Sequence, residues 1–294
     1  MGDTLHLARS DEPGPSMTKM LSEQAVAQYR EAGYFSPVNV LSPEEVAEVR
    51  GALERFEAAQ AGPLAGPQRS KSHLLFPWVD SLMRHHGILD AVEDLIGPNL
   101  LCWNTLFWIK EARSESFVSW HQDARYWGLD TDELVTAWVA LSPANEISGC
   151  MRVLPGSHRE SLLAHRDEYA ADNLLTRGQS ISEGVDESRA VVMALEPGQM
   201  SIHNVKLAHA SGPNESDDRR IGISLHYIPT HARQTVGAWD SAALVRGRDD
   251  YGHFEHTPQP RHELDPVGVA FHERAQSALR DILFTDAERV RPTL

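Results

Sequence analysis

The chain has 294 residues, of which 41% are hydrophobic and 23% charged, and its formal net charge is −15 at pH 7. These proportions are typical of a globular protein with a large core, and the acidic balance, with no run of Lys and Arg to offset it, argues against a nucleic-acid partner. No apolar run reaches the roughly 20 residues that a membrane-spanning helix needs. The first 30 residues also lack the apolar stretch of a signal peptide, so we expect a cytoplasmic protein.

The N-terminal third predicts a tail followed by helices. Residues 1–18 are polar and contain Pro, so we expect a mobile tail, with a single domain over residues 19–294. Serine residues that precede apolar stripes at helical spacing, and a Gly-Pro stop, mark the helix ends. Helices are expected over 22–35, 41–59 and 78–100, the last as one or two helices, with a flexible connection over 61–70.

From about residue 100, short apolar segments alternate with clusters of turn-forming residues. The predicted strands are 100–110, 116–124, 134–141, 150–157, 190–195, 199–205, 207–212 and 220–228. Strands at this spacing favour a sandwich or a jelly roll over alternating βα units. The expected fold class is therefore mainly β with flanking helices. Residues 158–186 are expected to form a long insertion with some helix, and residues 231–294 a loop and a final helix.

The segment WHQDARYWG, residues 120–128, places His121 and Asp123 one residue apart among aromatic side chains. Residues i and i+2 of a strand point to the same face, so both side chains can ligate one metal ion. The spacing is weak evidence by itself, because the chain has 15 His and the pair His165 and Asp167 repeats it. That second pair lies in the polar insertion, and we expect it at the surface.

A second informative segment, HASGPNESDDRRIGISLHYIP, begins at His209. Its turn-rich loop lets His209 lie beside the strand that starts near Arg220. Alternation places Arg220, Gly222, Ser224 and His226 on one face of this strand and Ile221, Ile223, Leu225 and Tyr227 on the other. Small side chains next to a guanidinium form a recess for a carboxylate, which Arg220 can grip through both oxygens. Arg219 is the alternative anchor, but alternation points it away from this face.

Two histidines and one carboxylate on one side of a metal form the facial triad of non-haem Fe(II) oxygenases, which leaves three coordination positions open. His121, Asp123 and His209 supply this set. His203, in the segment SIHNVKLAH, is the rival of His209 as the second histidine.

At these residues the chain resembles the phytanoyl-CoA dioxygenase family of Fe(II)/2-oxoglutarate-dependent oxygenases, over roughly residues 100–230. The matching segments are WHQD at His121 and Asp123, TAWVAL around Trp138, GCMRVLPGSH from Gly149, HASGPN from His209 and RIGISLHY from Arg220. Because only His209 has Arg220 at the family's spacing, His209 is favoured over His203. The resemblance implies the jelly-roll alternative, a cupin-like double-stranded β-helix.

The resemblance implies roles for individual residues. His121, Asp123 and His209 would hold iron, while Arg220, helped by Ser211, would bind the distal carboxylate of 2-oxoglutarate. Further lining residues of the cosubstrate pocket would be Trp138 and, in a looser alignment, Asn104 and Leu106. Candidate substrate contacts are Arg125, Tyr126, Trp127, His73 and Trp78. The aromatic residues Trp103, Phe107 and Trp108 are expected in the core.

The implied reaction uses Fe(II), O₂ and 2-oxoglutarate, decarboxylates 2-oxoglutarate to succinate and CO₂, and hydroxylates a small molecule. Related halogenases replace the carboxylate of the triad with a small residue, so Asp123 favours hydroxylation, while desaturation, epoxidation and ring formation stay open. The alternatives are a metal-dependent hydrolase or isomerase, against which Arg220 argues, and a non-catalytic jelly-roll binding protein, against which the full ligand set argues. No motif indicates the substrate or the oligomeric state.

Overall fold

The structure is a computed structural model that describes residues 18–287. The expected tail therefore lies outside the described residues, apart from Thr18. The first two predicted helices are present as α1 (Glu23–Ala32) and α2 (Pro43–Ala59). Each begins at a serine whose hydroxyl accepts a backbone hydrogen bond from the first turn, Ser22 from Ala25 and Ser42 from Glu45, and such caps stabilise a helix start.

The segment between α2 and the first long strand is more ordered than expected. Instead of a flexible connection, residues 61–70 contain the short helix α3 (Gly66–Arg69), and the 3-10 helix η1 (Ser72–Leu74) follows. The amide oxygen of Asn104 holds this segment, because it accepts hydrogen bonds from the Ser70 hydroxyl and the Lys71 backbone. Two helices follow as predicted, α4 (Pro77–Met83) and α5 (His86–Ile96).

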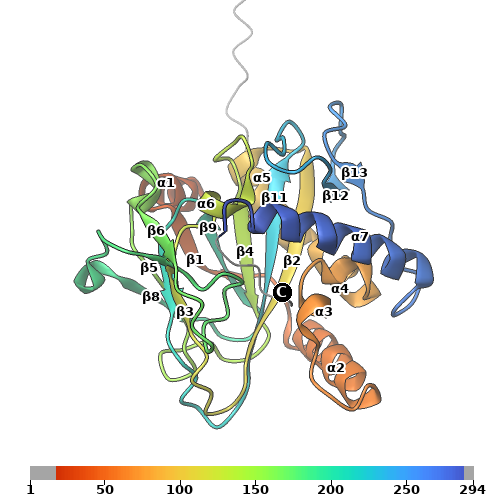
Figure 1. The fold of residues 1–294 in the computed structure, drawn as a ribbon, viewed down its shortest axis with the longest axis horizontal. Coiled ribbons are helices and arrows are strands. Elements are labelled where there is room, and N and C mark those ends of the chain that lie inside the picture. Colours follow the sequence, from red (N-terminus) through yellow and green to blue (C-terminus); the bar gives the residue numbers. More distant parts are fainter. Residues whose placement is uncertain (1–17, 288–294) are drawn as a thin grey trace, which may run out of the picture.

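All eight predicted strands are present, distributed over two facing sheets (Figure 1). The large sheet has the order β1 (Tyr34–Asn39), β9 (Gln199–Asn204), β4 (Val135–Ala140), β11 (Arg220–Pro229), β2 (Leu100–Lys110), β12 (Ser241–Arg246) and β13 (Glu255–His256). The small sheet has the order β3 (Val118–His121), β10 (His209–Ser211), β5 (Met151–Val153) and β8 (Val191–Met193). This arrangement is the predicted mainly β jelly roll.

The insertion and the C-terminal segment differ in how well they were predicted. Within residues 158–186, β6 (His165–Asp167) and β7 (Gln179–Ile181) form an antiparallel pair. The segment contains only the end of the 3-10 helix η2 (Ser157–Arg159), so the prediction of a helix there is wrong. Backbone pairing between two short strands takes the place of a helix. The expected final helix is present as α7 (Pro266–Leu283), which passes in front of the large sheet in Figure 1.

Strand β11 separates the core from the interior cavity. Its apolar side chains Ile221, Ile223, Leu225 and Tyr227 pack into the largest hydrophobic cluster together with helices α1, α2, α4 and α5. Residues on its other face line a cavity, so the predicted alternation is confirmed. Within residues 18–287, no helix combines the length and the apolar character needed to cross a membrane.

Candidate active site

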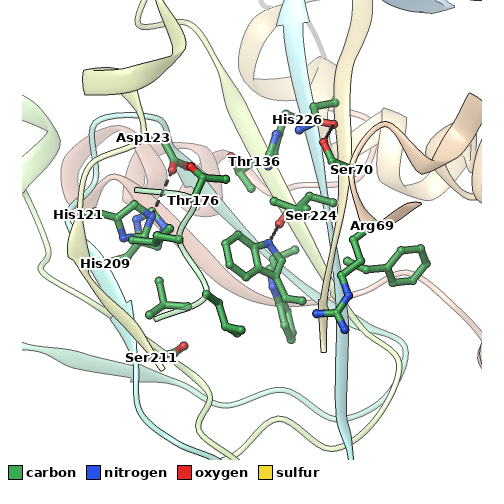
Figure 2. A pocket seen from close by; sticks show the side chains of 18 of the residues that line it. Arg69, Ser70, His121, Asp123, Thr136, Thr176, His209, Ser211, Ser224 and His226 are labelled. Carbon is green, nitrogen blue, oxygen red and sulfur yellow. Dashed lines mark hydrogen bonds and ion pairs between the residues drawn. The ribbon is translucent and has the colours of Figure 1, made fainter. Parts of the chain in front are cut away.

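A cavity of about 370 Å³ lies between the two sheets (Figure 2). Strands β2, β4, β9 and β11 form one wall, and β3, β5 and β10 form the other. Other parts of the wall come from segments to which the sequence assigned no role, including Arg69 of α3, Gln179 of β7, and Leu279 and Leu283 of α7. The insertion and the C-terminal helix therefore help to enclose this site.

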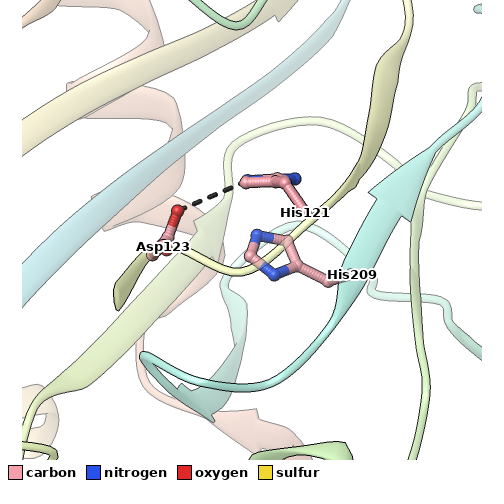
Figure 3. A group of neighbouring side chains, drawn as sticks. All are labelled: His121, Asp123 and His209. Carbon is pink, nitrogen blue, oxygen red and sulfur yellow. Dashed lines mark ion pairs between the residues drawn. The ribbon is translucent and has the colours of Figure 1, made fainter. Parts of the chain in front are cut away.

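Three of the predicted residues meet at one side of this cavity (Figure 3). Strands β3 and β10 are antiparallel and place His121 opposite His209, while Asp123 follows the end of β3. One ligand atom from each residue lies within 4.8 Å of the others, and an Asp123 oxygen lies 3.3 Å from His121 Nε2. Within the described residues, no other group of three His, Cys, Asp or Glu side chains is arranged to hold a metal.

Backbone carbonyls orient both histidines of this group. His121 Nδ1 lies 2.9 Å from the Ser119 carbonyl oxygen, and His209 Nδ1 lies 2.9 Å from the Leu207 carbonyl oxygen. A carbonyl only accepts, so each Nδ1 carries the ring proton and each Nε2 keeps its lone pair. Metal-binding histidines commonly donate their other ring N–H to such a backbone carbonyl.

The segment between His121 and Asp123 is held by residues of the insertion. The Gln122 backbone N–H donates to His165 Nε2 at 3.0 Å, and the Gln122 amide oxygen accepts from the Leu163 backbone at 2.8 Å. His165 is therefore partly buried and supports the site, which corrects its expected place at the surface. Its partner in the repeated motif, Asp167, pairs instead with Arg177.

The protonation states of the group suit metal binding. Burial by itself would raise the pKa of Asp123, but the neighbouring His121 and His209 outweigh it and hold the pKa below its usual range. Burial, with a contribution from His121, lowers the pKa of His209 to about 4. At neutral pH the group therefore offers a carboxylate and a neutral imidazole, which are the forms that bind a metal ion.

Arg220 presents an unpaired cation to the same cavity. It is 3% exposed, its Nε and Nη2 have no hydrogen-bond partner, and its guanidinium lies 5.3 Å from the centre of the Trp138 ring. Burial lowers its pKa to about 10, so it remains charged at pH 7. A buried charge without a partner is costly, so these free donors fit the distal carboxylate of 2-oxoglutarate.

Lys110 is a second buried basic residue at this end, and the sequence analysis missed it. It lies opposite Arg220 in the pairing of β2 with β11, and its ammonium donates to the Ser211 hydroxyl at 2.7 Å and to the Gly149 carbonyl at 3.3 Å. Because Ser211 accepts this bond, its own proton remains free to donate to an anion beside Arg220. Knowledge of the strand register would have revealed Lys110.

The remaining predicted residues fall into two groups. Ser211, Trp138, Asn104, Leu106 and Trp127 line the cavity, and so do Trp103, Phe107 and Trp108, which were expected in the core alone. The other four substrate candidates, Arg125, Tyr126, His73 and Trp78, are not among the lining residues. Two of these have structural partners, since His73 Nδ1 contacts the Thr105 hydroxyl and the Trp78 indole donates to Glu263.

Neither alternative residue, His203 as a metal ligand or Arg219 as the carboxylate anchor, has the geometry for that role. The His203 ring contacts the His209 ring, with 4.9 Å between their centres, but His203 is not part of the three-residue group. Arg219 points away from the cavity and donates to Glu57 at 2.7 Å. The geometry thus favours His209, as the family resemblance did, and Arg220, as the strand alternation did.

The jelly roll and a buried group of two histidines and one carboxylate are features that a non-haem iron oxygenase requires, and comparisons with known proteins show that the chain belongs to this class. A family model described as phytanoyl-CoA dioxygenase (PhyH) matches residues 29–222. A protein of Stutzerimonas stutzeri, described as a probable alpha-ketoglutarate-dependent hypophosphite dioxygenase, is 26% identical over 252 residues, which cover 78% of this chain and 87% of that protein.

Solved structures give the same result. The apo structure of the non-haem monooxygenase ThoJ is 35% identical, has a TM-score of 0.78, and covers 88% of this chain and 97% of its own. The structure of CytC3 with Fe(II) and alpha-ketoglutarate, at 24% identity and a TM-score of 0.63, shares the fold over 84% of this chain and 96% of its own.

The chain belongs to the phytanoyl-CoA dioxygenase (PhyH) family. It is a non-haem iron, 2-oxoglutarate-dependent oxygenase, and its cofactors are Fe(II) and 2-oxoglutarate. This class decides against the two alternatives, a metal-dependent hydrolase or isomerase and a non-catalytic binding protein.

Proposed function

We propose that this protein hydroxylates a C–H bond of a small organic molecule, with Fe(II) held by His121, Asp123 and His209 and with 2-oxoglutarate anchored by Arg220. In the balanced reaction, one oxygen atom of O₂ enters the product alcohol and the other enters succinate, and CO₂ leaves. The observation that carries the proposal is the buried Arg220, whose unused donors share one cavity with the three-residue group. A metal-dependent hydrolase would have no use for this cation.

The triad residues would bind iron through His121 Nε2, His209 Nε2 and the Asp123 carboxylate, which leaves three positions for 2-oxoglutarate and O₂. When bound, iron supplies the activation of O₂ that is coupled to decarboxylation of 2-oxoglutarate. The Asp123 carboxylate would take the place on iron that a halide needs, so its presence supports hydroxylation over halogenation.

The other residues of the cavity would hold and shield the reactants. Arg220 would grip the distal carboxylate through two donors, and Ser211 would add a third because Lys110 occupies its acceptor side. The Trp138 indole covers the guanidinium and would keep water away from this charge pair. Exclusion of water strengthens every electrostatic contact in the site.

The decisive experiment is an anaerobic titration of the protein with Fe(II) and then 2-oxoglutarate, followed through the weak visible charge-transfer band of the complex. We expect a saturable band in the wild type and at least about a 30-fold weaker affinity for 2-oxoglutarate in Arg220→Met, because charge-assisted contacts of a buried pair contribute about 2 kcal/mol or more.

Arg219→Met is the matched control, since it removes the neighbouring guanidinium, whose partners are Glu57 and Glu111 rather than the cavity. It should leave the band and the succinate yield unchanged. Tight metal binding without a band in the wild type would contradict the proposed function.

A further inference from the structure

Three buried polar side chains form a row across the large sheet at the side of the cavity away from Arg220. His226 of β11 lies directly opposite Thr136 of β4, and Thr136 lies directly opposite His203 of β9. All three line the cavity. We call His226, Thr136 and His203 the polar row.

The polar row has hydrogen-bonding groups without partners. His226 Nδ1, the Thr136 hydroxyl and both ring nitrogens of His203 are buried and have no partner in the protein. The residues are 3%, 2% and 2% exposed, respectively. Each such group lowers stability by about 1–3 kcal/mol, so three of them side by side in a cavity indicate that a ligand supplies the missing partners.

The place of the row separates it from the 2-oxoglutarate anchor. Arg220 and His226 stand on the same face of β11, six residues and therefore about 20 Å apart, which exceeds the length of a five-carbon diacid. The row also borders the metal ligands, since His203 contacts His209. Figure 2 shows Thr136 and His226 on the side of Asp123, with Ser211 at the opposite end of the cavity.

The surroundings of the row are uncharged and aromatic. Among the described lining residues, the acidic and basic ones other than histidine are Asp123 in the triad, Arg220 at the far end, and Arg69 of α3. Burial lowers the pKa of His226 to about 4, so this ring is neutral at pH 7. The Trp127 ring lies 4.5 Å from His226, and the Trp103 ring lies 5.1 Å from Trp127, so an apolar wall adjoins the row.

Building on the proposed function, we propose that the polar row is the substrate anchor and that it selects an uncharged molecule with a group that both donates and accepts hydrogen bonds, such as an amide. The Thr136 hydroxyl donates to the carbonyl oxygen of this group, and a histidine nitrogen accepts its N–H. The adjoining hydrocarbon part packs against Trp127 and Trp103. An ammonium group would meet no free carboxylate at the row, and a carboxylate or phosphate no cation.

The test uses three probes of one shape and different charge: cyclohexanecarboxamide, cyclohexanecarboxylate and cyclohexylmethylammonium. Each is added to protein loaded with Mn(II) and 2-oxoglutarate, and the transverse NMR relaxation of the probe protons reports binding near the metal, with Mg(II) as the diamagnetic reference. We expect the carboxamide to be relaxed at least about fivefold more than either charged probe, the equivalent of about one net hydrogen bond.

Two variants connect this result to the row. Thr136→Val and His226→Phe keep the shape of each side chain and should each reduce relaxation of the carboxamide roughly fivefold, while the melting temperature of the protein without ligand rises, because an unpartnered polar group has been removed. Thr136→Ser, which keeps the hydroxyl, should retain carboxamide binding.

Thr105→Val is the matched control. Thr105 is also a buried threonine of the large sheet, but its hydroxyl contacts Ser72 at 2.9 Å and accepts from the His73 backbone at 3.1 Å. Its loss should lower the melting temperature and leave the relaxation of the carboxamide unchanged. A purely structural role for Thr136 would give the same pattern as Thr105.

The proposal is overturned if a charged probe is relaxed as strongly as the carboxamide, if none of the probes is relaxed, or if Thr136→Val and His226→Phe leave the carboxamide signal unchanged. The visible band of Fe(II) and 2-oxoglutarate, recorded on the same preparations, separates the two hypotheses. Formation of the band without selective probe binding rejects the substrate anchor alone, whereas absence of the band rejects the proposed function.

Discussion

The two ends of the cavity differ in charge although the same strand, β11, contributes to both. At one end Arg220 and Lys110 are buried side by side, and burial together with the charge of Arg220 lowers the pKa of Lys110. At the other end His226, Thr136 and His203 are neutral or uncharged and lack hydrogen-bond partners. The difference supports the two proposals, an anion at the first end and a neutral polar group at the second, by which the site would distinguish its two organic reactants by charge.

The largest effect is expected when a proposed metal ligand is removed, because the reaction at both ends of the cavity depends on iron. Asp123→Ala is expected to lower Fe(II) affinity and succinate formation at least about 100-fold, since even partners that only support a metal ligand contribute about 10–100-fold. Asp167→Ala is the control, because Asp167 belongs to the repeated His-x-Asp motif but pairs with Arg177. Equal loss of metal binding in both variants, measured by titration with Fe(II), would contradict the assigned triad.

Gly222 makes room for the Trp138 indole next to Arg220, because a Cβ at position 222 would overlap this ring. Gly222→Ala should therefore displace Trp138 and weaken 2-oxoglutarate binding about tenfold or more, consistent with the roughly 1–3 kcal/mol that overpacking costs. Gly62→Ala is the control, since a Cβ at position 62 meets no atom within 4 Å. An unchanged dissociation constant in Gly222→Ala, measured through the visible band, would show that Trp138 does not shape the anion end.

Lys110 makes the anion end sensitive to pH. Burial, together with the charge of Arg220 and opposed by Cys150, lowers the pKa of Lys110 to about 6 in the folded protein, from 10.5. Between these values the unfolded chain binds more protons than the folded one, so the free energy of unfolding should rise with pH. Lys110→Met should reduce this rise between pH 6.5 and 8.5 in urea denaturation experiments. It should also weaken 2-oxoglutarate binding about fivefold, the equivalent of about one net hydrogen bond, because Ser211 loses the donor that fixes its hydroxyl.

Lys206→Met is the control for Lys110, because Lys206 pairs with the exposed Asp132. It should keep both the pH dependence and the affinity for 2-oxoglutarate. If Lys110→Met retains the full pH dependence of the wild type, the proton that links folding to pH belongs to another group.

The sequence predicted those parts of the site that local spacing determines. The polar face of β11 from Arg220 to His226 follows from the two-residue period of a strand. The same argument selected His121 and Asp123, but β3 ends at His121 and Asp123 has a helical backbone conformation, so a turn after the strand brings the pair together. His209 required the resemblance to a family, because spacing alone also allowed His203. The alternation of side chains along a strand thus identified which residues share one of its faces.

Features that depend on pairing between distant strands were not predictable in this way. Lys110 is important because it lies opposite Arg220, and the polar row exists because Thr136 lies between His226 and His203 in register. The insertion and α7 reach the cavity through tertiary packing, which leaves no local signal in the sequence. His165 was misjudged for the same reason, since its partner Gln122 is 43 residues away.

The smallest expected effects concern stability, and they test whether Arg220 is held ready for an anion. Arg219 is paired with Glu57 and Glu111 at the surface, so Arg219→Met should lower the free energy of unfolding by up to about 1 kcal/mol. Arg220 has unused donors in a buried cavity, so Arg220→Met should raise it by about 1 kcal/mol in the absence of 2-oxoglutarate. With Fe(II) and a high concentration of 2-oxoglutarate, the wild type should become more stable than Arg220→Met, because it gains about 2 kcal/mol more binding free energy than the variant. If Arg220→Met instead destabilises the ligand-free protein as Arg219→Met does, Arg220 has a structural partner, and the anion end is not preorganised for its ligand.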